Sequence, residues 1–417
     1  KGNGIVLITD LINGTLGELI TYFSDRSGGE HLIYETYAYE SLRTANRMVF
    51  GDEVIPYYNI READFLISFN AGFLETWISN VEYAYDFSRF HAPGDENKNI
   101  FVWIGPRTSM TAANADLSLI IPPGREYMLA AALLRHLADR KQLNHLNSQD
   151  REQIEKLTRN ITIETAAEKT GIDKSIIEKV GKRFTRAEKP LVLAEGLPIS
   201  SPRSLETAVA ANLLCKIKPG SRKLIDFSRP HALSITATGE KMKNLTERMQ
   251  NGEIALLMVC DANPVFTLPA SWKFAEALEK VPLKVSFSSC EDETSRYADL
   301  ILPANTPLES WGDYRPREKI FNMIQPAMGT IYDTRQLGDI FLSVGRKVVG
   351  AQAFPAERFL NILEASWSKL KDDHMPGISE KEFWLRVRQK GGIWNTENTE
   401  AAASDRKSTR LNSSHYS

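Results

Sequence analysis

The sequence has 417 residues, of which 42% are hydrophobic and 25% charged, and its formal net charge is −2. This length allows two or three domains with a sizeable core, and the near-neutral charge gives no indication of a nucleic-acid or membrane-surface partner. No uninterrupted apolar stretch approaches the roughly 18 residues that a membrane-spanning helix needs, so we expect no transmembrane span.

The first part of the chain alternates predicted strands and helices. The apolar run 5–9 predicts a buried strand, and a turn at Asn13 and Gly14 leads into a helix over 15–23. Further strands are predicted at 31–34, 65–69, 100–104 and 119–121, and helices at 40–49, 74–90 and 127–137. Strands that alternate with helices favour parallel βαβ units.

Residues 148–188 are charged and predicted to be helical. Within them the segment 165–173 resembles the turn of a helix-turn-helix, which in a DNA-binding protein precedes a basic recognition helix. The helix predicted over 174–184 is mixed in charge, so the charge pattern that DNA binding requires is missing from the sequence. We therefore expect no nucleic-acid partner.

A second α/β stretch begins at residue 189. It carries predicted strands at 191–194, 254–259, 283–287 and 300–302, and helices at 204–214 and 271–278. Residues 310–395 are predicted to be extended loop followed by helices at 337–348, 355–370 and 380–389. The expected fold class is therefore α/β, with two Rossmann-like parallel-sheet domains that carry helices on both faces, and a helical and loop part of a further domain.

The expected domain boundaries follow from this pattern. Residues 1–35 start a first α/β domain, 36–188 form a second one with a helical end, 189–308 continue the first, and 309–397 belong to a partial further domain. The chain opens inside a core strand without a leader segment, so we expect it to be truncated upstream. Residues 398–417 are expected to be disordered, and we interpret them as an adapter artefact rather than a natural tail.

The residues that most often bind metals give no site by their spacing. Cys215, Cys260 and Cys290 form no C-x-x-C pair, which argues against a zinc site, a cluster site or a disulfide framework. Cys260 ends an apolar run and is expected to be buried. His91 and His231 have no second ligand at metal spacing and are interpreted as loop residues. The aromatic residues at 77, 83, 85, 87 and 90 predict core or a subunit interface.

Three loops that follow predicted strands, at 10–15, 70–77 and 261–266, combine polar residues with glycine or proline. Ligands of open parallel sheets bind outside the carboxyl ends of the strands, and free backbone N–H groups at a helix start can hold a phosphate. Taken singly, each loop fits an ordinary turn between a strand and a helix better than it fits a ligand site.

In chain order, however, these loops join further segments into a recognisable series. The segments are 63–69, 73–77, 105–112, 115–116, 122–126, 263–264, 293–295, 298–303, 308–312, 325–327 and 333–335. The series resembles the signatures of the molybdopterin oxidoreductases of the dimethyl sulfoxide reductase type, over about residues 1–395. Within this family the segments 31–46 and 73–77 are similar to large subunits of polysulfide or thiosulfate reductase, alternative complex III and the quinone reductase complex of sulfate reducers.

The resemblance implies an interior fragment of an oxidoreductase large subunit in a quinone-linked respiratory complex, acting on a small substrate such as a sulfur compound. It implies a bis-molybdopterin guanine dinucleotide cofactor that holds molybdenum or tungsten. A [4Fe–4S] cluster is expected only in an N-terminal domain outside this chain. The implied partners are an iron–sulfur subunit and a membrane quinone-interacting subunit, on the periplasmic side of a bacterial inner membrane.

Carried over residue by residue, the resemblance assigns a set of cofactor-binding candidates. They are Asn13, Gly14, Thr15, Asn70, Glu75, Pro106, Arg107, Glu126 and Asn263. Arg107 can pair with a phosphate in bidentate geometry, and Glu126 can accept hydrogen bonds from guanine N–H groups. For Arg107 and Glu126 a surface salt bridge is the alternative.

The chain departs from the family at two places. Where active members carry a Cys, selenocysteine, Ser or Asp ligand, this sequence has Glu35 and Thr36, and a thiolate suits such a metal better than a lone carboxylate. Asn70-Ala71-Gly72 stands where the family commonly has Gly-Ala-Asp. The alternative is therefore a metal-free structural or electron-transfer subunit with a vestigial pterin cleft. A nucleotide-binding dehydrogenase is disfavoured, because no G-x-G-x-x-G turn follows the first strand.

Overall fold

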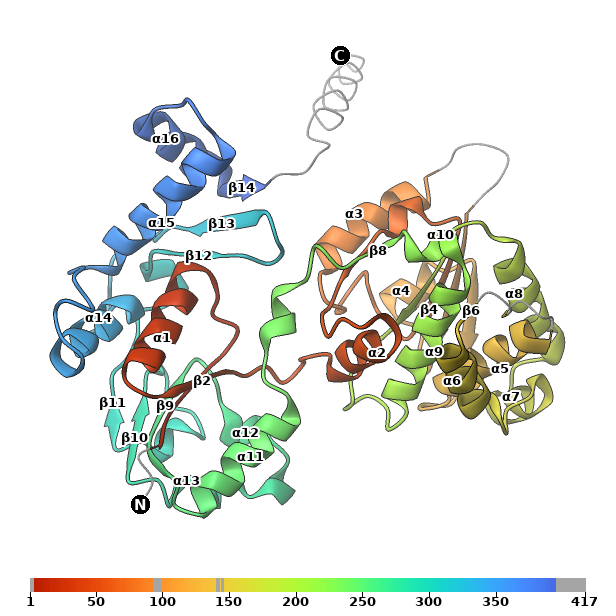
Figure 1. Cartoon of the computed structure of the whole chain (residues 1–417), viewed down its shortest axis with the longest axis horizontal. Coiled ribbons are helices and arrows are strands. Elements are labelled where there is room, and N and C mark those ends of the chain that lie inside the picture. Colours follow the sequence, from red (N-terminus) through yellow and green to blue (C-terminus); the bar gives the residue numbers. More distant parts are fainter. Residues whose placement is uncertain (1–3, 93–98, 140–142, 144–145, 395–417) are drawn as a thin grey trace, which may run out of the picture. The chain divides into compact units, whose positions relative to one another are not determined.

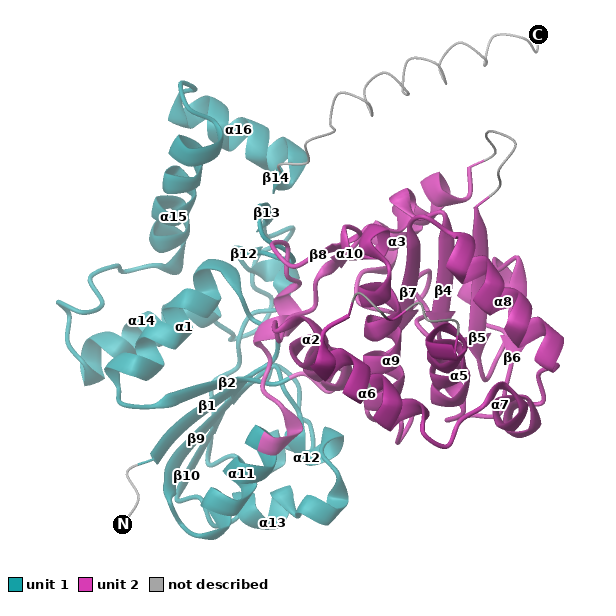
Figure 2. Ribbon diagram, turned by 45° about the vertical axis from the view of Figure 1, so that its right-hand side comes forward, with its two compact units in different colours: residues 1–34, 241–417 teal, residues 35–240 magenta. Residues whose placement is uncertain are grey.

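The computed structural model describes residues 4–92, 99–139, 143 and 146–394. The chain divides into two compact units (Figure 2): unit 1 comprises residues 1–34 and 241–417, and unit 2 comprises residues 35–240. The expected tail at 398–417 lies outside the described residues. Across the described residues, no helix is both long enough and apolar enough to cross a membrane.

Unit 1 is built on a five-stranded parallel sheet in the order β11-β10-β9-β1-β2. The strands are β1 (Gly4–Thr9), β2 (Glu30–Ile33), β9 (Ile254–Cys260), β10 (Leu283–Ser286) and β11 (Leu300–Ile301). Val6, Leu7 and Ile8 of the central strand β1 are fully buried, which requires cover on both faces of the sheet. Figures 1 and 2 show this cover: α1 (Gly14–Arg26) and α14 (Leu337–Val348) lie on one side, and α11 (Gly239–Gln250) and α13 (Phe274–Leu278) on the other.

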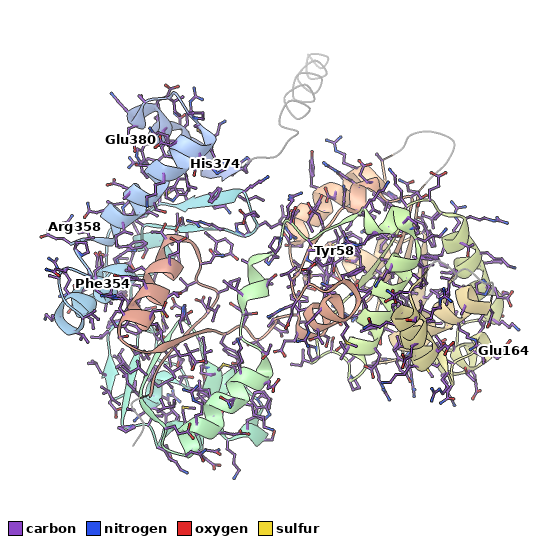
Figure 3. The ribbon with its side chains drawn as sticks, viewed as in Figure 1. Tyr58, Glu164, Phe354, Arg358, His374 and Glu380 are labelled. Carbon is purple, nitrogen blue, oxygen red and sulfur yellow. The ribbon has the colours of Figure 1, made fainter. Side chains whose placement is uncertain are left out.

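The C-terminal part of unit 1 adds a small antiparallel sheet that the sequence did not predict. It consists of β12 (Gly312–Tyr314), β13 (Ile320–Ile324) and β14 (Gly392–Trp394), in that order. Between β13 and β14 run α14, α15 (Phe359–His374) and α16 (Glu380–Lys390). Figure 3 labels Glu380 at the start of α16, where its carboxylate accepts a hydrogen bond from Ser368 of α15. Trp367 of α15 is fully buried beneath this sheet and anchors the helix.

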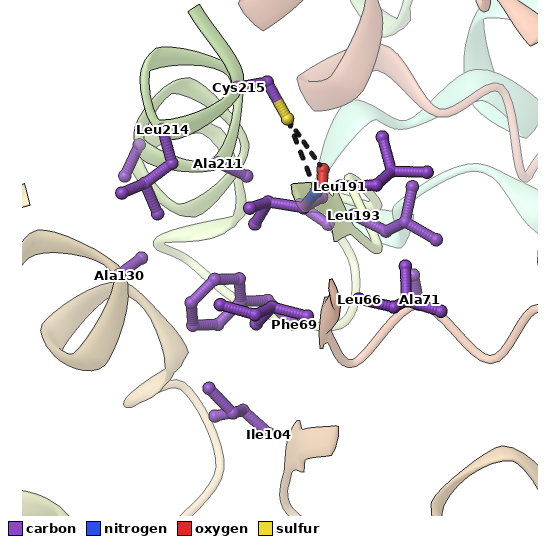
Figure 4. Close-up of a cluster of buried hydrophobic side chains, with 14 of the residues drawn as sticks. Leu66, Phe69, Ala71, Ile104, Ala130, Leu191, Leu193, Ala211, Leu214 and Cys215 are labelled. Atoms are coloured by element: carbon purple, nitrogen blue, oxygen red, sulfur yellow. Dashed lines mark hydrogen bonds between the residues drawn. The ribbon is translucent and has the colours of Figure 1, made fainter. Parts of the chain in front are cut away.

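Unit 2 is built on a four-stranded parallel sheet in the order β6-β5-β4-β7. The strands are β4 (Phe65–Phe69), β5 (Ile100–Gly105), β6 (Leu117–Ile120) and β7 (Pro190–Ala194). Helix α9 (Ser204–Ile217) packs on β7 and against α2 (Glu40–Phe50) and α5 (Glu126–Asp139). In the core shown in Figure 4, Ala211 and Leu214 of α9 lie over the strands, and the thiol of Cys215 donates to the carbonyl of Val192 at 3.5 Å. Both parallel sheets are flanked by helices, so the predicted fold class is confirmed.

The remaining elements of unit 2 are short or helical. The strands β3 (Tyr57–Tyr58) and β8 (Ile225–Asp226) form a two-stranded antiparallel ribbon. The charged segment folds into α6 (Ser148–Thr158), α7 (Ile163–Thr170) and α8 (Lys174–Arg186). Gly171, with φ of 73°, ends α7 in the left-handed conformation that favours glycine, and the apolar face of α8 is buried. The other helices of the unit are α3 (Asn80–Phe90), α4 (Met110–Ala113) and α10 (Pro219–Arg222).

The division into units differs from the expected domain boundaries at two points. We expected the first domain to resume at residue 189, but β7 pairs in parallel with β4 from Phe65 and Pro190 onward, so the first unit resumes only at residue 241. We also expected residues 309–397 to form part of a further domain, whereas the described part of this segment packs within unit 1. Neither difference is visible in a local pattern, because both depend on pairing between distant segments.

Two predicted helices are shorter than their periodicity indicated. The helix expected over 74–90 begins at Asn80, because the carbonyl of Gly72 accepts the backbone N–H groups of Glu75, Thr76 and Trp77 in a tight turn. The helix expected over 271–278 is interrupted at Lys273, which has φ of 58° and separates a short 3-10 turn from α13. In both cases a turn replaces the first helical residues.

Candidate functional site

The clearest candidate site lies at the carboxyl ends of the parallel strands in unit 2. Asn70 follows β4, Gly105 ends β5 and Glu195 follows β7. Because β4 pairs in parallel with both β5 and β7, these three ends lie along one edge of the sheet. This edge is where open parallel sheets bind their ligands.

Asn70 and Glu195 are joined side chain to side chain. The Nδ2 group of Asn70 donates to Oε2 of Glu195 at 2.9 Å, and the hydroxyl of Ser200 donates to the same oxygen. The backbone carbonyl of Glu195 accepts the indole N–H of Trp77 at 3.1 Å. Asn70 has φ of 56°, a left-handed backbone that asparagine tolerates better than most residues. The strand ends are therefore held in one defined arrangement.

Glycine at position 105 makes this arrangement possible. A Cβ atom on Gly105 would lie 2.9 Å from Oδ1 of Asn70 and 3.0 Å from the ring of Trp103. Any side chain at this position would displace the amide that holds Glu195. Because Gly105 has no side chain, the end of β5 leaves room for the side chain of Asn70. The polar groups at this edge therefore come from the residues that follow β4 and β7, Asn70 and Glu195.

Glu126 brings a second carboxylate to the site. It opens α5, is 5% exposed, and its Oε2 atom is buried with no hydrogen-bond partner among the described residues. Burial raises the pKa of Glu126, and the charge of Glu195 raises it further. Backbone N–H groups of Glu126 and Gly124 act against these effects on the pKa. Burying a carboxylate oxygen without a partner is costly, so the Oε2 atom can accept a hydrogen bond from a ligand.

Arg107 supplies positive charge that acts on Glu195. It is exposed, lies two residues beyond the end of β5, and forms no ion pair or hydrogen bond with the part of the chain that the structure describes. Burial raises the pKa of Glu195, while the hydrogen bonds from Ser200 and Asn70 and the charge of Arg107 lower it. A buried carboxylate and a half-buried one, with an exposed guanidinium acting on the second, suit a ligand that carries both N–H or O–H donors and an anionic group.

Two other predicted residues near this edge have internal roles. The Oε2 atom of Glu75 accepts the backbone N–H of Met110 at 2.9 Å, so the carboxylate caps the start of α4. Pro106 is half-buried and lies between the last residue of β5 and Arg107. Asn70, Arg107 and Glu126 each interact with Glu195, whereas the carboxylate of Glu75 is bound to the backbone of α4.

In unit 1 the predicted phosphate-type loop is closed by a carboxylate of the same chain. Oδ1 of Asp313 accepts the backbone N–H of Thr15 at 2.7 Å, and Oδ2 accepts the Thr15 hydroxyl at 2.9 Å. The side chain of Asn13 exchanges two hydrogen bonds of 2.9 Å with the backbone of Arg315. A Cβ on Gly14 would lie 2.5 Å from Oδ1 of Asp313. The Asp313 carboxylate thus accepts the N–H and the hydroxyl of Thr15 that we expected to be open to a phosphate.

Asn263, the remaining candidate in unit 1, is also bound internally. It caps the short helix α12 (Pro264–Thr267), donates to Glu293 at 2.6 Å and accepts the hydroxyl of Thr294 at 2.7 Å. Nearby, Asp261 follows β9, and burial raises its pKa. These contacts order the loop beyond β9 and engage both the oxygen and the nitrogen of the Asn263 amide.

The expected metal-ligand region offers little to a metal. Glu35 is half-buried and Thr36 exposed, just beyond the end of β2. Within the described residues, no three His, Cys, Asp or Glu side chains are grouped so that they could hold a metal ion. His91 ends α3 and stacks on Phe87, and His231 caps a 3-10 turn by accepting the N–H of Leu233.

Sequence reasoning missed Glu195, although a signal for it was present. The run at 191–194 was predicted as a buried strand, and the first residue after it is an acid. An acid at the carboxyl end of a parallel strand is a candidate ligand contact on position alone. The significance of Glu195 depends on the pairing of β7 with β4, because only that pairing places it beside Asn70.

Comparisons with known proteins agree with one another. A family model described as "Molybdopterin oxidoreductase" matches residues 127–347. The chain is 26% identical over 362 residues to "Menaquinone reductase, molybdopterin-binding-like subunit" of Nitratidesulfovibrio vulgaris, covering 83% of this chain and 52% of that protein. It is 23% identical over 347 residues to the assimilatory nitrate reductase catalytic subunit of Bacillus subtilis, covering 72% and 48%. The chain therefore spans about half the length of these relatives.

A solved structure shares the fold. The acetylene hydratase from Pelobacter acetylenicus superimposes with a TM-score of 0.65, covering 86% of this chain and 57% of that one. The sequence identity is 13%, so this likeness concerns the fold and not the chemistry.

Proposed function

Because the chain belongs to the molybdopterin oxidoreductase family, we propose that it is the cofactor-binding part of an oxidoreductase large subunit in a quinone-linked respiratory electron-transfer complex. Unit 2 would hold the nucleotide end of a molybdopterin guanine dinucleotide. The observation that carries this proposal is the buried, unpartnered Oε2 atom of Glu126. The charge of Glu195 acts on Glu126, and Glu195 in turn accepts a hydrogen bond from Asn70 and feels the charge of Arg107, at the kind of sheet edge where parallel sheets bind nucleotides.

The residues of unit 2 fit such a group. A carboxylate can accept hydrogen bonds from the adjacent N–H donors of a guanine edge. Such a donor would provide the hydrogen bond that the Oε2 atom of Glu126 lacks. The guanidinium of Arg107 can pair with a phosphate. The bound cofactor, in its bis form with molybdenum or tungsten, would supply two-electron redox chemistry, and the protein would bind and orient it.

The relative from Nitratidesulfovibrio vulgaris supports the proposed setting, since its name places it in a menaquinone reductase. We infer partners of two kinds: an iron–sulfur subunit and a membrane subunit that interacts with quinone. The proposed location is the periplasmic side of a bacterial inner membrane, and the proposed substrate is a sulfur compound. Co-purification of the native subunit from solubilised membranes with an iron–sulfur protein tests the assembly; isolation as a single free chain would contradict it.

The proposed cofactor site is tested by the variant Glu126→Gln in the full-length subunit. The amide keeps the size of the side chain but replaces one acceptor with a donor, so it clashes with guanine N–H groups. We expect the pterin and guanine content to fall at least about tenfold, because a buried hydrogen bond to a charged group contributes roughly 1.5–3 kcal/mol. The control is Glu75→Gln, which alters a carboxylate of the same edge that caps α4. Unchanged cofactor content in Glu126→Gln would refute the assignment.

A second candidate function is a metal-free subunit with a vestigial pterin cleft, acting in electron transfer or assembly. The chemistry of Glu35 and Thr36 favours it, because neither is the thiolate that suits molybdenum or tungsten. The word "like" in the name of the Nitratidesulfovibrio relative points the same way. Metal and pterin analysis of the native subunit separates the two candidates.

A further inference from the structure

We propose that Glu195, held in place by Asn70 and Ser200, binds the ribose hydroxyls of the nucleotide in unit 2 and thereby selects a ribonucleotide. This inference rests on the proposed function, since it assigns a second contact to the same ligand. Glu195 was not among the residues that the sequence indicated, and its role follows from the contacts that surround it.

The two oxygens of Glu195 are used differently. Oε2 accepts hydrogen bonds from Asn70 at 2.9 Å and from Ser200, which fix the orientation of the carboxylate. Oε1 has no hydrogen-bond partner among the described residues. A fixed carboxylate with one free oxygen is an acceptor for O–H donors. In parallel nucleotide-binding sheets, an acid beyond a neighbouring strand commonly holds a ribose hydroxyl.

The depths of the two carboxylates distinguish their roles. Glu126 is 5% exposed, and its free oxygen is buried, whereas Glu195 is half-buried. A flat base edge can reach a buried acceptor, while the sugar remains nearer to solvent. Glu126 therefore suits the base, and Glu195 suits the sugar.

The electrostatic interactions of Glu195 agree with this assignment of Glu126 to the base and Glu195 to the sugar. The charge of Glu195 acts on Glu126, and the charge of Arg107 acts on Glu195. Glu195 is thus the common neighbour of the deep acid and the free guanidinium. Base, ribose and phosphate follow one another in a nucleotide in the same order as Glu126, Glu195 and Arg107.

The glycine at the end of β5 supports this assignment. With a side chain at position 105, a Cβ would meet Asn70 at 2.9 Å, and the amide that orients Glu195 would move. The second acid, Glu195, follows β7, and β5 ends in Gly105 without a side chain. The pair of Asn70 and Glu195 requires Gly105 to remain a glycine.

The test is calorimetric titration of the full-length subunit, prepared free of cofactor, with three nucleotides. Guanosine monophosphate is the reference, deoxyguanosine monophosphate lacks the 2′-hydroxyl, and inosine monophosphate lacks the 2-amino group. We expect the wild type to prefer the reference over the deoxy form about tenfold, the effect of one hydrogen bond to a charged group. In Glu195→Gln this preference should fall to about twofold or less, while the preference over inosine monophosphate persists.

Controls make each outcome decisive. Glu126→Gln should lose the preference over inosine monophosphate and retain the preference over the deoxy form, and Glu75→Gln should retain both. Ser200→Ala, on an exposed loop, removes one of the two hydrogen bonds to Oε2 and should halve the ribose preference even if Glu195→Gln fails to fold. Full ribose preference in both Glu195→Gln and Ser200→Ala would overturn this inference and leave the proposed site intact. No binding of any nucleotide to the wild type would overturn both.

Discussion

Asp313 accepts two hydrogen bonds from Thr15, one from its backbone N–H at 2.7 Å and one from its hydroxyl at 2.9 Å. Trp367 donates a third bond to the same carboxylate at 3.1 Å. These contacts join the start of α1 to β12 and α15, across 298 residues of sequence. An internal anion thus occupies the positive end of α1, where a bound phosphate was expected.

The variant Asp313→Asn should destabilise the protein without changing its nucleotide content. Asp313 is 5% exposed, and an amide nitrogen would face donors that need an acceptor. We expect the free energy of unfolding to fall by about 2–4 kcal/mol, as measured by denaturant titration. Asp333→Asn, at an exposed position, is the control and should be neutral. A neutral Asp313→Asn variant would show that the carboxylate does not hold this loop.

Glu126→Gln should stabilise the cofactor-free protein at pH 7 while weakening nucleotide binding. Burial raises the pKa of Glu126, so the folded protein bears the cost of ionising it at neutral pH. Removing that charge should raise the free energy of unfolding at pH 7. The gain should shrink as the pH falls, because wild-type Glu126 then takes up a proton. Glu75→Gln should lose stability instead, since it weakens a helix cap; a loss in both variants would contradict the account.

Asp86 should make the stability of unit 2 depend on pH between about 4 and 6. It is 3% exposed and accepts the hydroxyl of Tyr57, and burial raises its pKa from 3.8 to about 6 against the hydrogen bond from Tyr57 and the charges of Arg61 and Arg229. Between these values the folded state holds the extra proton, so stability falls as the pH rises.

The variant Asp86→Asn should remove this slope. The amide oxygen can still accept the Tyr57 hydroxyl, and the ionisation cost of roughly 3 kcal/mol no longer appears above pH 6. Urea titrations at pH 4, 5 and 6 measure the effect. Asp333→Asn should keep the wild-type slope. An unchanged slope in Asp86→Asn would assign the pH dependence to other groups.

The three cysteines should differ sharply in reactivity. Cys290 is exposed, whereas Cys215 and Cys260 are fully buried, and burial raises the pKa of Cys215 to about 12. Because the thiolate is the reactive form, a thiol reagent should modify Cys290 first. Mass spectrometry of peptides from the native protein should find label on Cys290, with label on Cys215 and Cys260 only after denaturation. Early labelling of Cys215 would contradict the packing of α9 on β7.

The sequence predicted elements well where the pattern was long and local. The central strands β1, β4 and β9 and the helix α14 agree with the apolar runs that predicted them. The small sheet was missed because β12 and β14 have only three residues each, and β14 joins from about 70 residues downstream of β13. Such pairing leaves no periodicity within a sequence window.

The candidate site was predictable only in part, for the same reason. The side chains of Asn70 and Glu126 were assigned by resemblance, and the structure places both at one edge of the sheet. The role of Glu195 and the closure of Thr15 by Asp313 depend on contacts across 125 and 298 residues. Contacts at such separations arise from the fold, and the local residue types do not encode them.

We propose that this chain holds a pterin nucleotide. Measuring pterin, guanine nucleotide, molybdenum and tungsten per subunit in the full-length native protein tests this proposal. We expect stoichiometric pterin with guanine nucleotide, and about one metal per chain with two pterins would make Glu35 or a water molecule the ligand to examine next. Finding neither pterin nor guanine nucleotide would contradict the claim and leave the metal-free subunit as the function.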